Sequence, residues 1–257
     1  MNHHYKQTQA IPYYLCDRNH QLTLSMLVNL LIEVSENHSA GLGREETYMN
    51  ERGISWIILR YEFDIKRMPE AKEEIEIETF ATEYNKLFTY RTFIVRDDKN
   101  NPLIEVKATF ALMDYKSRKM VRIPAVVVEP YEALFSKRIR REIKPHEIDR
   151  EQMSEKNYTV RYFDIDTNQH VNNSKYIEWL LDCLSPTFLT THEINHGIIT
   201  FDKEVKEGNE VTSRVSKRID DKIQTDHRID VDGISHAKAT FKWTENIIKE
   251  FNNGNDQ

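Results

Sequence analysis

Cysteine is scarce in this sequence, and it contains no long apolar run. Only Cys16 and Cys183 carry thiols among 257 residues, too few for a disulfide framework and suited to a reducing compartment. No apolar run approaches the roughly 20 residues that span a bilayer, so we expect no membrane insertion. The first residues, MNHHYKQTQAIPYY, show neither an apolar signal core nor an Arg/Ser-rich transit segment. We therefore expect a cytoplasmic protein.

The chain also lacks an excess of positive charge. Its formal net charge is −6, which argues against a broad electrostatic hold on nucleic acid. Hydrophobic residues make up 39% and charged residues 30%, a balance typical of a globular protein. The length suffices for one large or two small domains, each with its own core.

The hydrophobic pattern predicts a long helix followed by strands, twice over. Leu27, Leu31 and Val34 recur at helical spacing, whereas Ile75 and Ile77 alternate with glutamates as in a half-buried antiparallel strand. The expected elements are helices over 22–40 and 45–52, strands over 54–65, 73–80, 87–95 and 103–113, a partly helical linker, then a strand, a helix over about 172–184, and strands over 194–203, 210–219, 222–230 and 236–244.

The two halves of the sequence resemble each other. Aligning YYLCDRNHQLTLSMLVNLLIEV from Tyr13 with YFDIDTNQHVNNSKYIEWLLDC from Tyr162 matches Asp17 with Asp166 and Asn19 with Asn168. Near the end of each half stands KATF, at 107–110 and 238–241. Their shared order favours duplication, with one unit in residues 1–125, a linker over 126–150 and a second unit in residues 151–257.

Each unit is thus predicted to be one helix followed by a meander of antiparallel strands. A single curved sheet with one helix buries that helix against its concave face. Two such sheets joined edge to edge leave fewer exposed strand edges. We therefore predict an α+β fold, a tandem (double) hotdog in which two helices are each wrapped by a curved antiparallel sheet.

Polar residues concentrate just before the second helix. In DTNQHVNN, Asp166, Asn168 and His170 fall at alternate positions, so an extended chain would place their side chains on one face. Asn172 or Asn173 is suited to cap the helix that follows. The helix N-terminus offers unpaired N–H groups and a partial positive charge. Such donors suit the oxyanion that forms when water attacks a thioester carbonyl.

The string Asp-x-Asn-x-His-Val-Asn-Asn-x-x-Tyr, followed by Trp179, resembles the acyl–acyl carrier protein (acyl-ACP) thioesterase family of plants and bacteria, of the oleoyl type. The likeness runs roughly from Tyr13 to Thr244 and is strongest after Arg161. It implies hydrolysis of fatty acyl-ACP thioesters to free fatty acid and holo-carrier protein, with no cofactor. It also implies that the N-terminal unit holds the acyl chain and the C-terminal unit catalyses.

The resemblance further assigns an acidic residue, on the strand after the second helix, to Glu204. Accounts of the family place a catalytic cysteine directly after it, where this chain has Val205. Cys183 is no substitute, because it lies about 16 Å along the helix at 1.5 Å per residue. We therefore favour water as nucleophile, with Glu204 or His170 as general base. Asn168 would fix the water or the carbonyl, and Asp166 would orient the site or itself act as nucleophile.

The first half is expected to have lost catalysis. Gln21 stands opposite His170, and a glutamine cannot serve as acid or base near neutral pH. The predicted substrate contacts are Asn172, Asn173, Met26, Leu30, Val34 and Trp56.

A basic run could serve recognition of the carrier. Acyl carrier proteins are strongly acidic, so Lys137, Arg138, Arg140 and Arg141 are candidates for docking, although such a run is most often a solvated face. A fused double hotdog contains its own pseudo-dimer, so both a monomer and a homodimer stay open.

Four other classes of protein share some of these sequence features. His192 to His196 reads HEINH, the zinc-protease pattern, which needs a continuous helix; Gly197 and a strand-like run follow at once, so we expect no metal. A hotdog enoyl-thioester hydratase resembles Asp-x-Asn-Pro-x-His, but here Gln169 replaces proline and the histidine comes one position early. An acyl-thioester sensor would carry a DNA-binding module, and none is evident. An acyl-CoA thioesterase is the remaining alternative.

Overall fold

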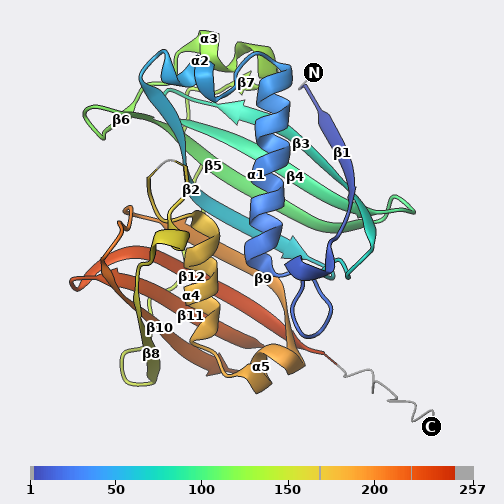
Figure 1. Ribbon diagram of the computed structural model, residues 1–257, viewed down its shortest axis with the longest axis vertical. Helices are drawn as coiled ribbons and strands as arrows, with labels where there is room; N and C mark the ends of the chain where they lie inside the picture. The colour runs from blue at the N-terminus through green and yellow to red at the C-terminus, as the bar shows by residue number, and fades with distance from the viewer. Residues whose placement is uncertain (1–2, 168, 221, 247–257) are drawn as a thin grey trace.

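The computed structural model describes residues 3–167, 169–220 and 222–246, which form two units stacked along the long axis (Figure 1). The N-terminal unit contains β1 (Tyr5–Ala10), η1 (Tyr13–Leu15), α1 (Leu24–Gly41), α2 (Glu46–Asn50), β2 (Ile54–Ile65), β3 (Glu74–Tyr84), β4 (Phe88–Asp97), β5 (Pro102–Asp114) and β6 (Met120–Val121). The chain continues with α3 (Ala125–Val128), η2 (Glu129–Tyr131) and β7 (Leu134–Phe135), which lie at the end of the N-terminal unit away from the C-terminal unit (Figure 1). The C-terminal unit contains β8 (Met153–Thr159), η3 (Tyr162–Asp164), α4 (Asn173–Asp182), α5 (Pro186–Thr191), β9 (His192–Phe201), β10 (Glu210–Ile219), β11 (Ile223–Val231) and β12 (Ile234–Glu245).

One sheet runs through both units, and its strand order repeats. The described strands form a 12-stranded sheet in the order β1-β3-β4-β5-β2-β9-β12-β11-β10-β8, with β6 added at β5 and β7 at β3. The first five strands correspond place by place to β8-β10-β11-β12-β9 of the second unit. The two sheets join where β2 and β9 pair antiparallel, from Arg60 opposite Thr200 to Asp64 opposite His196. The predicted edge-to-edge double hotdog is confirmed.

The two long helices lie on the same side of this sheet and contact each other (Figure 1). Thr23 begins α1, because its side chain accepts a hydrogen bond from the Met26 N–H at 3.2 Å. Asn172 begins α4 in the same way, accepting from the Ser174 N–H at 2.9 Å. The apolar stripe of each helix is buried in one continuous core, which fixes the helix N-termini relative to the sheet.

The first part of the predicted linker, α3 and η2, packs in the core of the N-terminal unit through Val127, Val128 and Tyr131. Residues 137–150 form an ordered strap across the outer face of the sheet. The Arg140 N–H donates to the Tyr90 hydroxyl at 3.2 Å, and the Asp149 N–H donates to Ser216 Oγ at 3.0 Å. These contacts lie on β4 of one unit and β10 of the other. The strap therefore crosses the junction between the units on the face opposite the helices.

The longest of the elements that were not predicted are β1 and α5. β1 pairs with β3 as the edge strand of the first unit, and α5 lies between α4 and β9. Within the described residues, no helix is both long enough and apolar enough to cross a bilayer.

Candidate active site

The segment from Asp166 to His170 is a tight turn, which corrects the prediction of an extended stretch. The Asp166 N–H donates to the His170 carbonyl at 2.8 Å, and the Gln169 N–H donates to the Asp166 carbonyl at 3.0 Å. Gln169 has a left-handed backbone (φ 65°), which reverses the chain within a few residues. Asp166 and His170 therefore face each other from the two arms of the turn, and Asn168 lies outside the described residues.

The His170 ring meets Glu204 at the rim of a cavity. His170 Nε2 lies 3.1 Å from Glu204 Oε2, and the two side chains are 21% and 33% exposed. A histidine beside a carboxylate is the arrangement that orients and polarises a general base. The geometry therefore brings together two of the predicted site residues that lie far apart in the sequence.

Glu204 lies beyond the end of β9 rather than on the strand, and α4 holds its loop in place. The Tyr176 hydroxyl accepts from the Val205 N–H at 2.8 Å, and the Val171 N–H donates to the Val205 carbonyl at 3.3 Å. Burial raises the pKa of the Tyr176 phenol, so it stays protonated and available as a hydrogen-bond partner. Tyr176 thus ties the carboxylate loop to the histidine turn.

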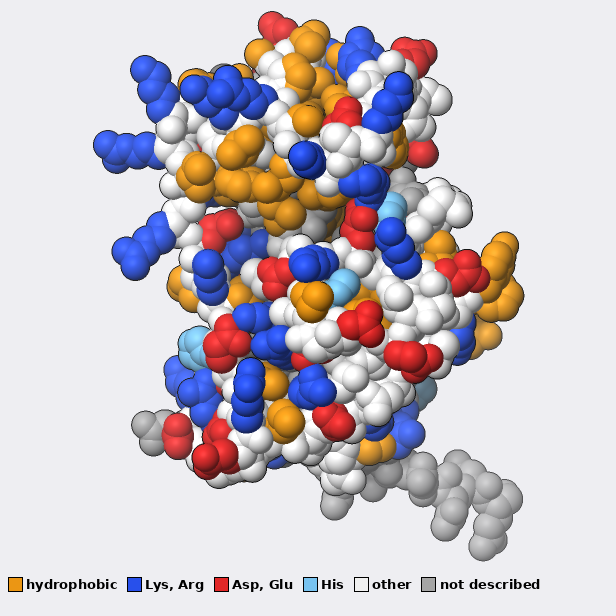
Figure 2. Space-filling view, turned by 90° about the vertical axis from the view of Figure 1, so that its left-hand side faces the viewer, with side chains coloured by type: hydrophobic (Ala, Val, Ile, Leu, Met, Phe, Trp, Pro, Cys, Tyr) orange, Lys and Arg blue, Asp and Glu red, His pale blue; other side chains and the backbone are white. Residues whose placement is uncertain are grey.

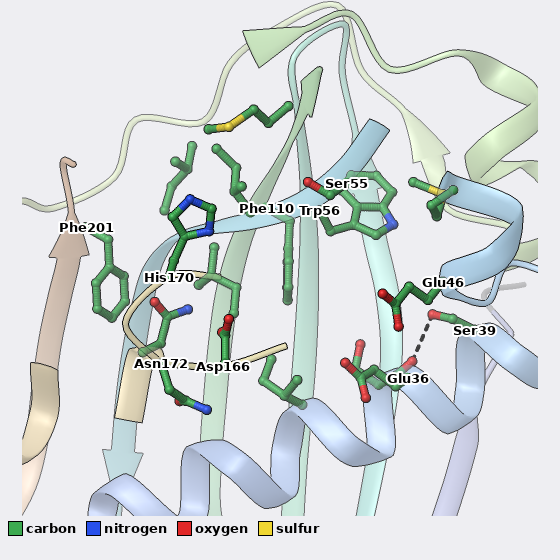
Figure 3. Close-up of a pocket in the computed structure, with 18 of the residues that line it drawn as sticks. Glu36, Ser39, Glu46, Ser55, Trp56, Phe110, Asp166, His170, Asn172 and Phe201 are labelled. Atoms are coloured by element: carbon green, nitrogen blue, oxygen red, sulfur yellow. Dashed lines mark hydrogen bonds between the residues drawn. The ribbon is translucent and has the colours of Figure 1, made fainter. Parts of the chain in front are cut away.

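A cavity of about 950 Å³ runs from this rim into the N-terminal unit. Asp166, His170 and Asn172 point into it from the C-terminal unit, opposite Trp56 and Phe110 (Figure 3). Its apolar lining comes mostly from Val28, Ile32, Trp56, Ile58, Phe110, Met113 and Phe201. The site is thus assembled from both units, as a long hydrocarbon chain with a polar reacting end requires.

Among the predicted substrate contacts, Asn172, Asn173 and Trp56 line the cavity. Met26, Leu30 and Val34 instead pack in or against the core. A different stripe of α1 faces the cavity, and its members are Val28, Ile32, Ser35, Glu36 and Ser39. The hydrophobic period of α1 predicted the face of the helix that packs in the core. The residues that line the cavity lie on the neighbouring face of the same helix.

The far part of the cavity is polar. Glu36 of α1 and Glu46 of α2 face each other there (Figure 3), and burial, then the charge of Glu46, raises the pKa of Glu36. Arg91 also lines this part and donates to Thr79 Oγ1 at 3.1 Å. Burial lowers the Arg91 pKa to about 10, so the guanidinium stays charged near neutral pH.

The zinc-protease pattern is not formed. His192 to His196 opens strand β9, so the required helical face is absent. His196 pairs with Asp64 at 2.8 Å, and ligand atoms of His196, Asp64 and Glu62 all lie within 4.8 Å of one another. Glu62 is already paired with Arg60 at 2.7 Å. This group could hold a cation, but it is not among the residues that line the cavity.

Cys183 lies away from the cavity, as predicted. It follows the end of α4, and its Sγ donates to the Ser213 carbonyl at 3.2 Å. Burial raises the pKa of the thiol, which keeps it in the poorly nucleophilic protonated form.

Sequence reasoning missed Arg118, which lies between β5 and β6. Its guanidinium donates to Glu204 and lies 3.0 Å from His170 Nε2. The basic stretch KSRK around it was a signal, but nothing in the sequence joined that stretch to the second unit. The predicted docking residues, Lys137, Arg138, Arg140 and Arg141, are exposed on the strap. Thr89 and Arg91 line the cavity, whereas Tyr90 between them contacts the strap, so these docking residues lie on the other face of the sheet.

A double hotdog with a histidine–carboxylate pair at the mouth of an acyl-sized cavity defines a class of thioester hydrolases. Comparison with known proteins narrows this class. Residues 2–131 match the model of the acyl-ACP thioesterase N-terminal domain, and residues 147–245 match that of the C-terminal domain. The chain belongs to the acyl-ACP thioesterase family, which confirms the predicted family and thioester hydrolase activity.

Individual relatives agree with this. An oleoyl-ACP thioesterase of Coriandrum sativum is 25% identical over 95% of this chain and 70% of its own length. An acyl-ACP hydrolase of Cuphea viscosissima is 26% identical over 74% of this chain, which spans only 49% of that relative. A structure assigned as an oleoyl thioesterase of Lactobacillus plantarum superposes with a TM-score of 0.92 at 33% identity, covering 95% of this chain and 97% of the other. The 12:0-ACP thioesterase of Umbellularia californica (TM-score 0.84, 20% identity, 95% and 98% covered) shares the fold.

Proposed function

We propose that this chain hydrolyses fatty acyl-ACP by activating water at the His170–Glu204 pair. The observation that carries this is the 3.1 Å contact between His170 Nε2 and Glu204 Oε2 at the rim of the cavity. The pair takes a proton from water while the hydroxide oxygen bonds to the thioester carbon. The carbon–sulfur bond then breaks, and the proton leaves with the thiolate of the carrier arm, so that fatty acid and holo-carrier protein are the products.

The N-terminus of α4 supports the oxyanion in this proposal. The N–H groups of Ser174 and Lys175 are already engaged by Asn172 at 2.9 Å each. The Asn173 N–H and side chain remain the donors that we assign to the developing negative charge. Asp166, across the turn from His170, orients the water or the carbonyl, and we assign Asn168 the same task. Attack by Asp166 itself is the alternative that the experiments below test.

The acyl chain enters the N-terminal unit past Trp56 and Phe110. The acidic far part of the cavity disfavours a purely apolar occupant there, because burying Glu36 and Glu46 against hydrocarbon would remove their solvation. We therefore infer that acyl chains end before these two residues. Two free thiols, Cys16 and Cys183, support a reducing compartment such as the cytoplasm, and a monomer or a homodimer remains our expectation.

The carrier protein is proposed to dock through Lys137, Arg138, Arg140 and Arg141. Their exposure supports this proposal. Their place on the outer sheet face means that the carrier arm would have to pass around the edge of the unit. Figure 2 shows the left-hand side of Figure 1, toward which the hairpin of β5 and β6 projects. Lys and Arg side chains are spread over both units on this side, so positive charge is not confined to one place. Any test of the four residues therefore needs a charge-matched control.

The function is tested by following thiol release from acyl-ACP and acyl-CoA thioesters from short to long chains. We expect release, with acyl-ACP preferred over acyl-CoA of the same chain length. Absence of release from every thioester would refute the proposal. A loss of the ultraviolet absorbance of an enoyl thioester would show that its double bond is hydrated, and this result would instead indicate a hydratase.

The proposed mechanism is tested by replacing Asp166, His170 and Glu204 singly with alanine. Each replacement is expected to lower kcat by about 100-fold or more, the usual contribution of a positioned acid or base. Full hydrolysis by all three variants would overturn the assignment. In a single turnover in ¹⁸O-water, ¹⁸O in the Asp166 carboxylate would show a covalent route in which water opens the mixed anhydride at the Asp166 carbon, because direct attack by water places ¹⁸O only in the fatty acid. Trapping with hydroxylamine detects the anhydride whichever of its two carbonyl carbons water attacks.

A further inference from the structure

The turn between β5 and β6 presents one arginine toward the other unit. Asp114 builds this turn, since its Oδ1 accepts from both the N–H and the hydroxyl of Ser117 at 2.7 Å. The Arg118 N–H donates to the Asp114 carbonyl at 2.9 Å, and Arg118 has a left-handed backbone with φ 53°. A non-glycine residue is held in this conformation only when its surroundings impose it. The turn therefore fixes where the Arg118 side chain begins.

From this turn, the Arg118 guanidinium reaches both members of the proposed catalytic pair. The same nitrogen, Nη2, donates to Glu204 Oε1 and lies 3.0 Å from His170 Nε2. The other carboxylate oxygen, Glu204 Oε2, lies 3.1 Å from the same ring nitrogen of His170. Both carboxylate oxygens and one ring nitrogen are therefore engaged at once.

These contacts place two incompatible demands on His170 Nε2. If this nitrogen carries a proton, it donates to Glu204 and cannot accept from Arg118. If it carries a lone pair, it accepts from Arg118 and faces the carboxylate oxygen without a proton between them. In either case Nε2 has no lone pair left for a proton from water, and Oε1 of Glu204 is already paired with the guanidinium. The contact thus describes a closed state of the pair.

The substrate itself carries a group that would draw the guanidinium away. The acyl chain on a carrier protein is linked through phosphopantetheine, whose phosphodiester is an anion. Arginine binds phosphate oxygens through two parallel hydrogen bonds, more tightly than a shared contact to one carboxylate oxygen. Lys203 and Lys206 line the same cavity, and both are exposed. The rim is therefore suited to receive the phosphodiester next to Arg118, which is 37% exposed.

We propose that Arg118 is a positioning residue that holds the His170–Glu204 pair closed until the phosphodiester of the carrier arm takes its guanidinium. This inference rests on the proposed function, because it presupposes that the pair activates water. It makes turnover depend on an anion that takes no part in bond breaking. A thioester without the phosphate would bind its acyl chain in the cavity yet meet a closed pair.

The test uses two substrates with the same acyl chain, acyl-phosphopantetheine and acyl-pantetheine, which differ only in the phosphate. For the wild-type protein we expect kcat to be about 10-fold higher with the phosphate, as charge-assisted contacts to phosphate are strong. Arg118→Gln should raise kcat for acyl-pantetheine several-fold and bring the ratio of the two kcat values close to 1. Lys116→Gln removes one positive charge from the same turn, and the wild-type ratio is expected to persist in it.

A simple binding contact would behave differently. In that case the phosphate would act on KM, and Arg118→Gln would leave turnover of acyl-pantetheine unchanged or lower; either result overturns the proposal. A role limited to folding would leave the ratio of the two kcat values as it is in the wild-type protein.

Arg118→Lys is the second variant. The lysine stem is shorter than that of arginine, so its ammonium would not reach His170 and Glu204 from the same turn, and turnover of acyl-pantetheine should rise here too. It retains the charge of the turn, so it keeps the inference testable if Arg118→Gln does not fold. A wild-type protein that hydrolyses neither substrate nor acyl-ACP would refute the proposed function instead. Hydrolysis of both substrates with an unchanged ratio in both variants would refute only the role of Arg118.

Discussion

The turns before α1 and α4 share their backbone and differ in what they do. The Asp17 N–H donates to the Gln21 carbonyl at 2.9 Å, as the Asp166 N–H donates to the His170 carbonyl at 2.8 Å. The residue before the last has a left-handed backbone in both turns, with φ 61° at His20 and 65° at Gln169. Duplication has therefore preserved the turn while the side chain at its end changed from histidine to glutamine, or the reverse.

The first turn has become a brace between the units. Gln21 Nε2 donates to Glu193 Oε1 at 2.7 Å, and Asn19 Nδ2 donates to the Thr190 carbonyl at 3.2 Å. In the second turn, His170 instead faces the cavity and Glu204. The comparison shows that two copies of one turn have different roles: the first holds the two units together, and the second carries a residue of the candidate active site. The two units thus depend on each other, because the C-terminal unit supplies the histidine and the carboxylate and the N-terminal unit supplies the cavity for the acyl chain.

Making the second turn resemble the first should have the largest effect. His170→Gln retains the turn, because its hydrogen bonds come from the backbone, but removes the imidazole that we propose as part of the general base. We expect kcat to fall by about 100-fold to 10,000-fold, the range for loss of a general base. Thiol release from acyl-ACP measures this, with circular dichroism to show that the fold persists.

The matched change in the first turn is Gln21→Ala. It removes the contact to Glu193, so it should lower the free energy of unfolding by about 1 kcal/mol and change kcat less than 2-fold. A large loss of turnover in Gln21→Ala, or its retention in His170→Gln, would mean that the two turns do not divide bracing and chemistry as we describe.

Buried histidines in both units, His38 in the first and His227 and His236 in the second, make the stability of the protein sensitive to acid. Burial lowers the pKa of His38 in the first unit to about 3 and that of His227 in the second to about 4. An unfolded histidine has a pKa of about 6.5. The folded state thus favours the neutral ring, and its stabilisation is complete above pH 6.5 and is lost as pH falls toward the folded pKa.

Each histidine should contribute about 1.4 kcal/mol of lost stability per pH unit below 6.5. We predict that His227→Gln flattens the decline of unfolding free energy between pH 6.5 and 5 by about 2 kcal/mol, as measured by urea denaturation. His38→Asn should flatten it as well. An equally steep decline in both variants would show that other groups, such as paired carboxylates, cause the acid sensitivity.

A smaller effect is expected for docking on the outer sheet face. Reversal of Lys137, Arg138, Arg140 and Arg141 to glutamate should raise KM for acyl-ACP about 3-fold to 10-fold at low salt, and less at high salt. The control reverses four other exposed lysines, Lys66, Lys72, Lys86 and Lys99, which changes the net charge by the same amount. Equal KM values for the two variants would show that total charge, and not this strap, attracts the carrier.

Several elements could be predicted because their burial follows a simple period. Ile54–Ile65 and Glu210–Ile219 form strands with the predicted bounds, and in β3 the buried Ile75 and Ile77 alternate with the more exposed Glu74 and Glu76. β1 escaped prediction because its side chains alternate only between partly buried and exposed; backbone pairing with β3 holds it. Ser185 and Pro186 begin α5, where Ser185 Oγ accepts from the Phe188 N–H at 3.2 Å and proline suits the first turn.

The sequence predicted which residues form most of the site, but it did not predict the backbone conformation that brings them together. Asp166 and His170 stood out by their spacing before a helix, and Glu204 only through resemblance to the family. Their spacing fitted an extended strand as well as a turn, because sequence does not show that Gln169 adopts a positive φ. Arg118 was beyond prediction, since its partners belong to the other unit and meet it only after the two sheets join.

The smallest effect should come from the cysteines, which also differ between the units. Cys16 lies next to the first turn and forms an isolated backbone β-bridge with Leu22. Cys183 follows the end of α4, away from the cavity. Burial raises the pKa of both thiols, so neither is a ready nucleophile. We expect the double variant Cys16→Ala/Cys183→Ala to hydrolyse acyl-ACP with kcat within about 2-fold of wild type, because water activated by a base requires no thiol. Loss of turnover with an intact fold would return a cysteine to the mechanism and would leave the His170–Glu204 pair as its activator.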